Sequence, residues 1–366
     1  MNIITFIASL LLIVFIHLPA FVSAEASIIK TDNITVSEFK LFQLKHKEVV
    51  AIAFDRTLPA ILASDPLELN LEPNYNVSYG NNTMTINLSG NVDLAELNSD
   101  ISTITGSSRL KHLLAAVSKP GQLMLTLKYD NQMTAPHITT VKRKRVLKPD
   151  GSVLLRSYLV ISLVKRVGLP PKTIVLDAGH GGSALGATSN YLYEKELNLD
   201  ITRLACDIFD KHNYDVYMTR IDDSNPSLLD RADAANILAA DAFISIHNNS
   251  MPDDMPDNAK KLYRGTTALY NSAAPRPAKE LAQIMAAQLA SSLRIHQYPL
   301  QDRPGLIVLN ATWVPSIIVE VAMMPHPQDA KMIAQRIYRL EAAKAIFYAT
   351  DKYFMNSALS LDRGSL

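Results

Sequence analysis

Four residues in the second half of the chain could together bind a metal ion and move a proton. His180, His247 and Glu320 end the short apolar runs TIVLDAGH, AFISIH and SIIVE, and Glu194 follows the first of these runs. Two imidazoles and one carboxylate around an open position form the ligand set of a catalytic zinc site, which leaves one carboxylate over as a base. Zinc would polarise a carbonyl, and the base would carry a proton to a leaving amine. The pattern therefore predicts metal-assisted amide hydrolysis with one Zn2+ ion.

Three of these four residues also have a simpler explanation, and Glu320 does not. The glycines around His180 could cradle a phosphate, but the stretch lacks a G-x-G-x-x-G pattern and a Walker lysine. A histidine on an apolar strand is usually a core residue, yet polar residues follow His247 and place it at the edge of a sheet. Glu194 precedes an expected helix, whose dipole stabilises a carboxylate in any case. Glu320 ends an apolar run, where an ionised carboxylate needs a partner.

The elements that must position these residues follow an α/β pattern. Continuous β-branched runs are typical of strands buried on both faces of a parallel sheet, and such sheets carry their chemistry beyond the carboxyl ends of the strands. We expect a catalytic domain over residues 172–355, with a mostly parallel sheet sandwiched by helices, and a C-terminal tail over 356–366. The expected strands cover 173–177, 215–218, 242–246, 266–270 and 316–320, and the expected helices begin near residues 196, 228, 278 and 328.

The first half of the chain carries a different pattern. Short or alternating apolar runs such as VVAIAF, TMTINL and LMLTL predict a small β-rich, sandwich-like domain over residues 25–165. Residues 110–117 are expected to form a short helix within it. A linker over residues 166–171 follows, because Pro170 and Pro171 end regular structure.

Residues 1–24 predict a signal peptide, because a strongly apolar run is closed by Val-Ser-Ala. An uncleaved membrane anchor is the alternative, but His17 and Pro19 interrupt the run before it reaches spanning length. We therefore expect an exported, periplasmic protein without stable membrane insertion after cleavage. The net charge of +1 argues against a nucleic-acid partner, and the single cysteine, Cys206, excludes an internal disulfide and is expected to fill space in a helix.

The motifs of the second half resemble those of the zinc-dependent N-acetylmuramoyl-L-alanine amidases, the amidase-3 family, over roughly residues 172–355. In family order they are DAGHGG at 177–182, YEKELNL at 193–199, Thr219-Arg220 with Arg231 and Asn236, SIHNN at 245–249 and PSIIVE at 315–320. The resemblance implies zinc held by His180, Glu194 and His247, with Glu320 as the catalytic carboxylate. It also implies the substrate, which is the amide between the muramic acid lactyl group and the L-alanine of peptidoglycan stem peptides, cleaved in wall remodelling or daughter-cell separation.

Two loops depart from the family pattern. Residues 183–185 stand where Asp-Pro-Gly is usual, and 322–326 replace Gly-Phe-Leu-Ser-Asn, so that His326 either takes the place of the Asn or contacts the stem peptide. These changes leave the expected ligands intact and affect substrate fit. A related zinc peptidase on stem peptides, or a wall-binding protein that keeps the fold without activity, are the alternative functions.

Two further expectations concern partners. Some relatives carry a helical insert that plugs the zinc site until an activator protein of the cell envelope binds, but residues 251–261 are too short for a long plug, so we expect an accessible site. The β-rich part is similar to the AMIN domain, which would hold the enzyme on peptidoglycan. The basic run at 142–145 would contact anionic wall polymers or form a solvated turn.

Overall fold

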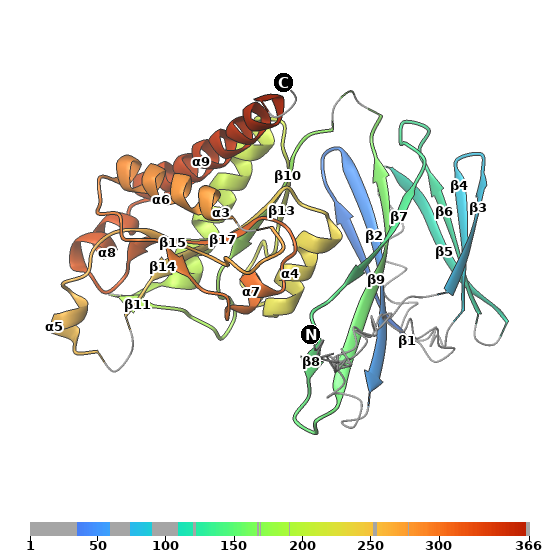
Figure 1. The fold of residues 1–366 in the computed structure, drawn as a ribbon, viewed down its shortest axis with the longest axis horizontal. Helices are drawn as coiled ribbons and strands as arrows, with labels where there is room; N and C mark the ends of the chain where they lie inside the picture. Colours follow the sequence, from blue (N-terminus) through green and yellow to red (C-terminus); the bar gives the residue numbers. More distant parts are fainter. Residues whose placement is uncertain are drawn as a thin grey trace, which may run out of the picture.

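A computed structural model describes residues 35–58, 74–89, 109–119, 122–166, 168, 170–189, 191–251, 255–276 and 278–363. A β-rich part, from Thr35 to Val164, lies beside an α/β part that begins at Thr173 (Figure 1). The expected signal peptide lies outside the described residues. No helix in the described part combines the length and the apolar character needed to cross a bilayer.

The β-rich part is the sandwich that the sequence predicts. One antiparallel sheet has the order β1-β2-β9-β7, with β8 paired to β9, and the other has the order β3-β4-β6-β5. The facing sides of the two sheets share one apolar core. The strands are β1 (Thr35–Gln43), β2 (Lys47–Leu58), β3 (Asn74–Gly80), β4 (Thr83–Ser89), β5 (Leu110–Lys119), β6 (Gln122–Tyr129), β7 (His137–Lys142), β8 (Val146–Leu147) and β9 (Val153–Val164).

The helix expected over residues 110–117 is wrong, because this segment is strand β5. Leu110 and Leu113 are both fully buried on the face that packs against the other sheet, although three positions separate them. The register of the β5–β6 pair shifts between Leu110 and His112, so one extra residue is inserted there. A β-bulge therefore produces the i, i+3 apolar spacing that otherwise indicates a helix.

The α/β part contains a mixed sheet of order β13-β10-β14-β17-β15-β16 among the described residues. Strands β13, β10, β14 and β17 are parallel, whereas β15 is antiparallel to β17 and carries β16 parallel to itself. The mostly parallel sheet expected from the sequence is confirmed. The strands are β10 (Thr173–Ala178), β13 (Asp215–Met218), β14 (Ala242–Asn249), β15 (Thr267–Tyr270), β16 (Gln301–Asp302) and β17 (Ser316–Met323), with a separate hairpin of β11 (Thr188–Ser189) and β12 (Leu192–Tyr193).

Helices cover both faces of this sheet. Helices α3, α6 and α9 pack on one face through a large apolar core, against which the partly buried Cys206 also packs, and α4 and α7 pack on the other face. Helix α9 continues beyond residue 355, so the expected tail begins inside it. The helices are α3 (Glu194–Lys211), α4 (Leu228–Ile237), α5 (Asp257–Lys260), α6 (Lys279–Leu293), α7 (Ile307–Asn310), α8 (Pro327–Ile333) and α9 (Arg336–Arg363).

The sandwich and the α/β part share a third apolar core. The outer face of the β1-β2-β9-β7 sheet packs against α4, α7 and the central sheet, and Figure 1 shows α4 between the two parts. Strand β2 is consequently buried on both faces, which explains why its run is continuously apolar in an antiparallel sheet. Its residues alternate between the two cores, with Val50, Ile52 and Phe54 facing the second sheet and Val49, Ala51 and Ala53 facing the α/β part.

Candidate metal centre

The parallel strands bring the four sequence-predicted residues to one edge of the sheet. His180 follows β10 by two residues, His247 lies in β14, and Glu320 lies directly opposite His247 on β17. Both β14 and β17 extend three residues further than expected, so His247 and Glu320 lie inside the strands and not at their ends. Glu194 is the first residue of α3, one position after the short strand β12.

Three of the four side chains meet closely. His180 Nε2 lies 3.2 Å from Glu194 Oε2, and His247 Nδ1 lies 3.0 Å from Glu194 Oε1. One ligand atom from each residue lies within 4.8 Å of the others, and no other group of this kind occurs in the described residues. A tetrahedral zinc ion with bonds of about 2.0–2.1 Å separates its ligand atoms by about 3.4 Å. The two imidazoles and the carboxylate therefore fit one such ion with small adjustments.

Hydrogen bonds fix the Glu194 carboxylate in this position. Oε2 accepts from the backbone N–H of Ala187 at 2.7 Å, and Oε1 accepts from the backbone N–H of Asn248 at 3.1 Å. The amide of Asn198 donates to Glu194 Oε1 at 3.2 Å and to the Gly179 carbonyl at 3.2 Å. Sequence reasoning did not single out Asn198, although it lies one helical turn after Glu194 and therefore on the same face of α3.

Two glycines allow the ligands to approach one another. A Cβ at Gly179 would lie 2.2 Å from His247 Nε2, and a Cβ at Gly186 would lie 2.5 Å from Glu194 Oε2. Gly186 also has a φ of +70°, which side chains rarely tolerate. The backbone itself thus forms part of the wall around the three ligands.

A buried ion pair holds the turn that carries His180. The Arg231 guanidinium donates to Asp177 Oδ1 at 2.7 Å and to the His180 carbonyl at 2.8 Å. Ser245 and Thr219 donate to the same Asp177 carboxylate, at 2.6 and 2.5 Å. Burial opposes ionisation of Asp177, but Arg231 and these hydroxyls outweigh it and lower the pKa of the carboxyl. His180 itself has a φ of 62°, so its left-handed backbone depends on this support.

The surroundings of Glu194 and Glu320 shift the pKa values of the two carboxyl groups in opposite directions. Burial opposes ionisation of Glu194, but its hydrogen bonds with His180 and His247 outweigh burial and lower its pKa. Burial would lower the pKa of His247, yet the hydrogen bond with Glu194 and the nearby Glu320 raise it overall. For Glu320, burial raises the pKa to about 7, with the negative charge of Glu194 adding to the effect and His247 opposing it.

Glu320 is therefore the carboxylate that lacks a fixed partner. Its Oε2 is buried and makes no hydrogen bond within the described residues. It stands outside the close group of three ligand atoms, on the strand next to His247. One carboxylate is arranged as an anionic ligand, and the other is poised to gain or lose a proton near neutral pH.

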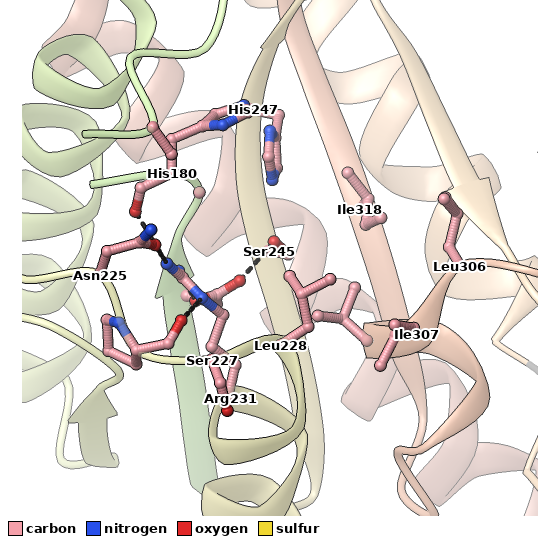
Figure 2. Close-up of a pocket in the computed structure, with 15 residues that line it drawn as sticks. His180, Asn225, Ser227, Leu228, Arg231, Ser245, His247, Leu306, Ile307 and Ile318 are labelled. Carbon is pink, nitrogen blue, oxygen red and sulfur yellow. Dashed lines mark hydrogen bonds and ion pairs between the residues drawn. The ribbon is translucent and has the colours of Figure 1, made fainter. Parts of the chain in front are cut away.

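A cavity of about 340 Å³ opens onto the two histidines. Figure 2 shows polar side chains, including Asn225 and Arg231, on one side of it and apolar side chains on the other. The His180 and His247 side chains remain 30% and 21% exposed, so the centre is open to solvent. The apolar side chains that line the cavity include Leu228, Leu306, Ile307, Val308 and Ile318.

Other residues singled out in the sequence have structural roles here. His326 caps helix α8 by accepting from the backbone N–H of Gln328 at 3.3 Å. Asn236 joins α4 to the segment before β17, because it donates to the Ala311 carbonyl and accepts from the Trp313 N–H. The described part of residues 251–261 contains only the four-residue helix α5, none of whose residues is buried.

Comparison with known proteins assigns the α/β part. Residues 174–352 match the family model of the N-acetylmuramoyl-L-alanine amidases, Amidase_3. The chain contains an amidase-3 domain. The family match begins within β10 and ends within α9, so the β sandwich lies outside it.

Relatives of the amidase-3 domain include two bacterial proteins. N-acetylmuramoyl-L-alanine amidase LytC of Bacillus subtilis (strain 168) is 31% identical over 183 residues, which are 50% of this chain and 36% of LytC. The probable cell wall amidase LytH of Staphylococcus aureus is 33% identical over 190 residues, which are 51% of this chain and 60% of LytH. The chain thus spans less than two thirds of either relative. The crystal structure of the N-acetylmuramoyl-L-alanine amidase from Clostridium difficile 630 is 28% identical, with a TM-score of 0.47, and covers 51% of this chain and 98% of that one.

Proposed function

We propose that the amidase-3 domain is a zinc-dependent hydrolase of peptidoglycan. It cleaves the amide between the lactyl group of N-acetylmuramic acid and the L-alanine of the stem peptide. The observation that carries this proposal is the convergence of His180, Glu194 and His247, whose ligand atoms lie within 4.8 Å of one another beside an open cavity. The family match and the names of the relatives support the choice of substrate.

The residues divide the work as follows. His180, Glu194 and His247 would hold the ion, and the hydrogen bonds from Asn198, Ala187 and Asn248 keep the carboxylate oriented toward it. When bound, zinc supplies Lewis-acid activation of water and of the amide carbonyl. Glu320 takes the proton of the attacking water on its unpartnered Oε2 and then delivers it to the leaving amine of L-alanine. The apolar side chains that line the cavity position the substrate against these groups.

We further propose that the protein acts outside the cytoplasmic membrane, because its proposed substrate is found there. The names of two relatives, an N-acetylmuramoyl-L-alanine amidase and a probable cell wall amidase, support this location. Periplasmic location, wall attachment through the sandwich and the involvement of an envelope activator stay predictions from the sequence. Amidase activity of purified protein without any partner is the corresponding test of the accessible site.

The decisive experiment compares two glutamates in the first turn of α3. Glu194 is buried at the proposed site, whereas Glu196 is exposed two residues later and serves as the matched control. We expect Glu194→Gln and His247→Ala to lose bound zinc, and Glu196→Gln to keep it. Glu320→Gln should keep zinc and lose turnover of purified sacculi.

Product analysis separates this function from its alternatives. Free muramic acid lactyl carboxylates with intact stem peptides identify an amidase, whereas shortened stems identify a peptidase. Zinc binding without any cleavage by the wild type would indicate a non-catalytic wall-binding protein. Full activity of Glu320→Gln would show that the assigned base is wrong.

A further inference from the structure

Helix α4 lies between the β sandwich and the metal centre and contacts both. Its residues 234, 235 and 237 belong to the apolar core that the sandwich shares with the central sheet. Its charged residues divide between two faces of the helix, because positions 230 and 233 lie on one side and position 231 lies on another. The polar contacts of α4 with the sandwich are therefore separate from its contacts with the centre.

Two buried side chains of the sandwich contact the face of α4 that carries positions 230 and 233. Arg143, which follows strand β7, donates from Nε to Asp233 Oδ2 at 2.5 Å and also contacts the Asp230 carboxylate. Tyr158, in β9, donates its hydroxyl to the same Asp233 oxygen at 2.6 Å. Tyr158 is fully buried, and the side chains of Arg143 and Asp233 are 9% and 2% exposed. For Arg143, neither a solvated turn nor a contact with wall polymers, the two alternatives for the basic run, agrees with this position.

The other face of α4 contacts the metal centre through Arg231. Arg231 donates to Asp177 and to the carbonyl of His180, whose backbone has a φ of 62°. Asp177 lies near the end of β10, and His180 lies in the turn after it, which directs the His180 imidazole toward Glu194. A displacement of α4 would withdraw the Arg231 guanidinium from this turn and remove its main support.

We propose that Arg143 and Tyr158 are positioning residues for the metal centre. They fix α4, and through Arg231 they set the backbone at His180 and thereby the affinity of the site for zinc. The sandwich is on this view a structural part of the catalytic unit and not only a device for attachment. The inference rests on the proposed zinc site.

The physical reason is the cost of an unpaired buried charge. Burial raises the pKa of the Asp233 carboxyl, and Arg143 and Tyr158 oppose that shift. Without Arg143, the Asp233 carboxylate would keep the Tyr158 hydroxyl but lose its ion-pair partner, so water would have to enter or the helix would have to move. Loss of the Tyr158 hydroxyl alone leaves the ion pair in place and should disturb α4 less.

The test measures zinc affinity of the full chain by competition with a chelator, together with kcat and KM on a soluble muropeptide. We expect Arg143→Met to weaken zinc binding about tenfold, the low end of the effect of removing a residue that orients a metal ligand. It should lower kcat at subsaturating zinc with little change in KM. Arg143→Lys should restore a part of the affinity, because it keeps the charge without the planar fork.

The matched control is a different polar contact in the same interface. His46, in the turn between β1 and β2, lies 3.0 Å from the buried Asp215 at the start of β13, at the opposite end of that strand from the metal centre. His46→Ala should lower the melting temperature and leave zinc affinity unchanged. Equal melting losses in Arg143→Met and His46→Ala with wild-type zinc affinity in both would overturn the inference.

Two outcomes keep this test separate from the test of function. If the wild type binds no zinc, the proposed function itself fails, whatever Arg143 does. If Arg143→Met does not fold, Tyr158→Phe provides the measurement, because it leaves no charge unpaired. A smaller loss of zinc affinity in Tyr158→Phe supports the inference, and unchanged affinity in that variant refutes it.

Discussion

The replacement Glu320→Gln should stabilise the metal-free protein at alkaline pH while abolishing catalysis. The Glu320 pKa of about 7 in the folded protein lies above the ordinary value of 4.5. Between these values the folded protein keeps a proton that the unfolded chain releases, so the stability of the metal-free protein falls as the pH rises through this window and stays low above it. The glutamine variant is neutral throughout and lacks this loss.

The size of the effect follows from the same two pKa values. At 1.36 kcal/mol for each pH unit between them, the ionised carboxylate costs about 3 kcal/mol at most. This figure is an upper value, because the residue is partly exposed although its Oε2 is buried. We expect a gain of about 2–3 kcal/mol in the unfolding free energy of the variant at pH 8 and almost none near pH 4.5.

Urea denaturation with a chelator present, at pH 4.5 and at pH 8, measures this difference. Adding zinc at pH 8 should reduce the advantage of the variant, because a nearby cation stabilises the carboxylate of the wild type. Gln328→Ala, which removes an exposed and uncharged side chain from α8, serves as the control and should show no such pH dependence. If Glu320→Gln gains the same stability at both pH values, Glu320 is not the group that titrates, and the electrostatic argument for it as the base is wrong.

Three further predictions follow from the centre. Gly179→Ala should reduce zinc affinity by at least about tenfold in a chelator titration, because its Cβ would lie 2.2 Å from His247 Nε2, whereas Gly305→Ala meets no atom within 4 Å and should bind normally. The acidic limb of kcat/KM against pH should fall at or below about pH 7, since the base must be ionised and bound zinc lowers the pKa of Glu320 further; a limb well above pH 7 would point to another base. Removal of zinc should lower the melting temperature of the wild type but not that of Glu194→Gln, as scanning calorimetry with and without chelator can show, and equal shifts in both would place the metal elsewhere.

The sequence predicted the α/β sheet and its site because the signals there are local. The central strands β10, β14 and β17 carry apolar runs rich in β-branched residues, and parallel strands necessarily present their carboxyl ends at one edge. His180, His247 and Glu320 could thus be placed together without knowledge of the pairing partners. The choice of Glu194 as the metal ligand and of Glu320 as the base required the family resemblance, because the dipole of α3 explains a carboxylate at position 194 equally well.

The contacts that orient the site were less accessible from the sequence. Asn198 could have been found, since its spacing of four residues from Glu194 places both on one face of a helix. Arg143 could not, because its partners Asp230 and Asp233 lie 87 and 90 residues further along the chain. The expectation of a helix over residues 110–117, which form strand β5, was wrong because a bulge changes the apolar spacing of the strand. No residue type in the sequence marks such a bulge.

One signal for the domain interface was present in the sequence and has a general physical meaning. An antiparallel sheet with one solvated face shows alternating apolar and polar residues, yet β2 and β9 contain the uninterrupted apolar runs VVAIAF and YLVI. Such runs require a second apolar partner on the outer face of the sheet. In this chain that partner is the amidase-3 domain, through α4, α7 and the central sheet. A sandwich joined by a flexible tether would expose this face to water, so the composition of β2 and β9 itself argues that the two parts fold against each other.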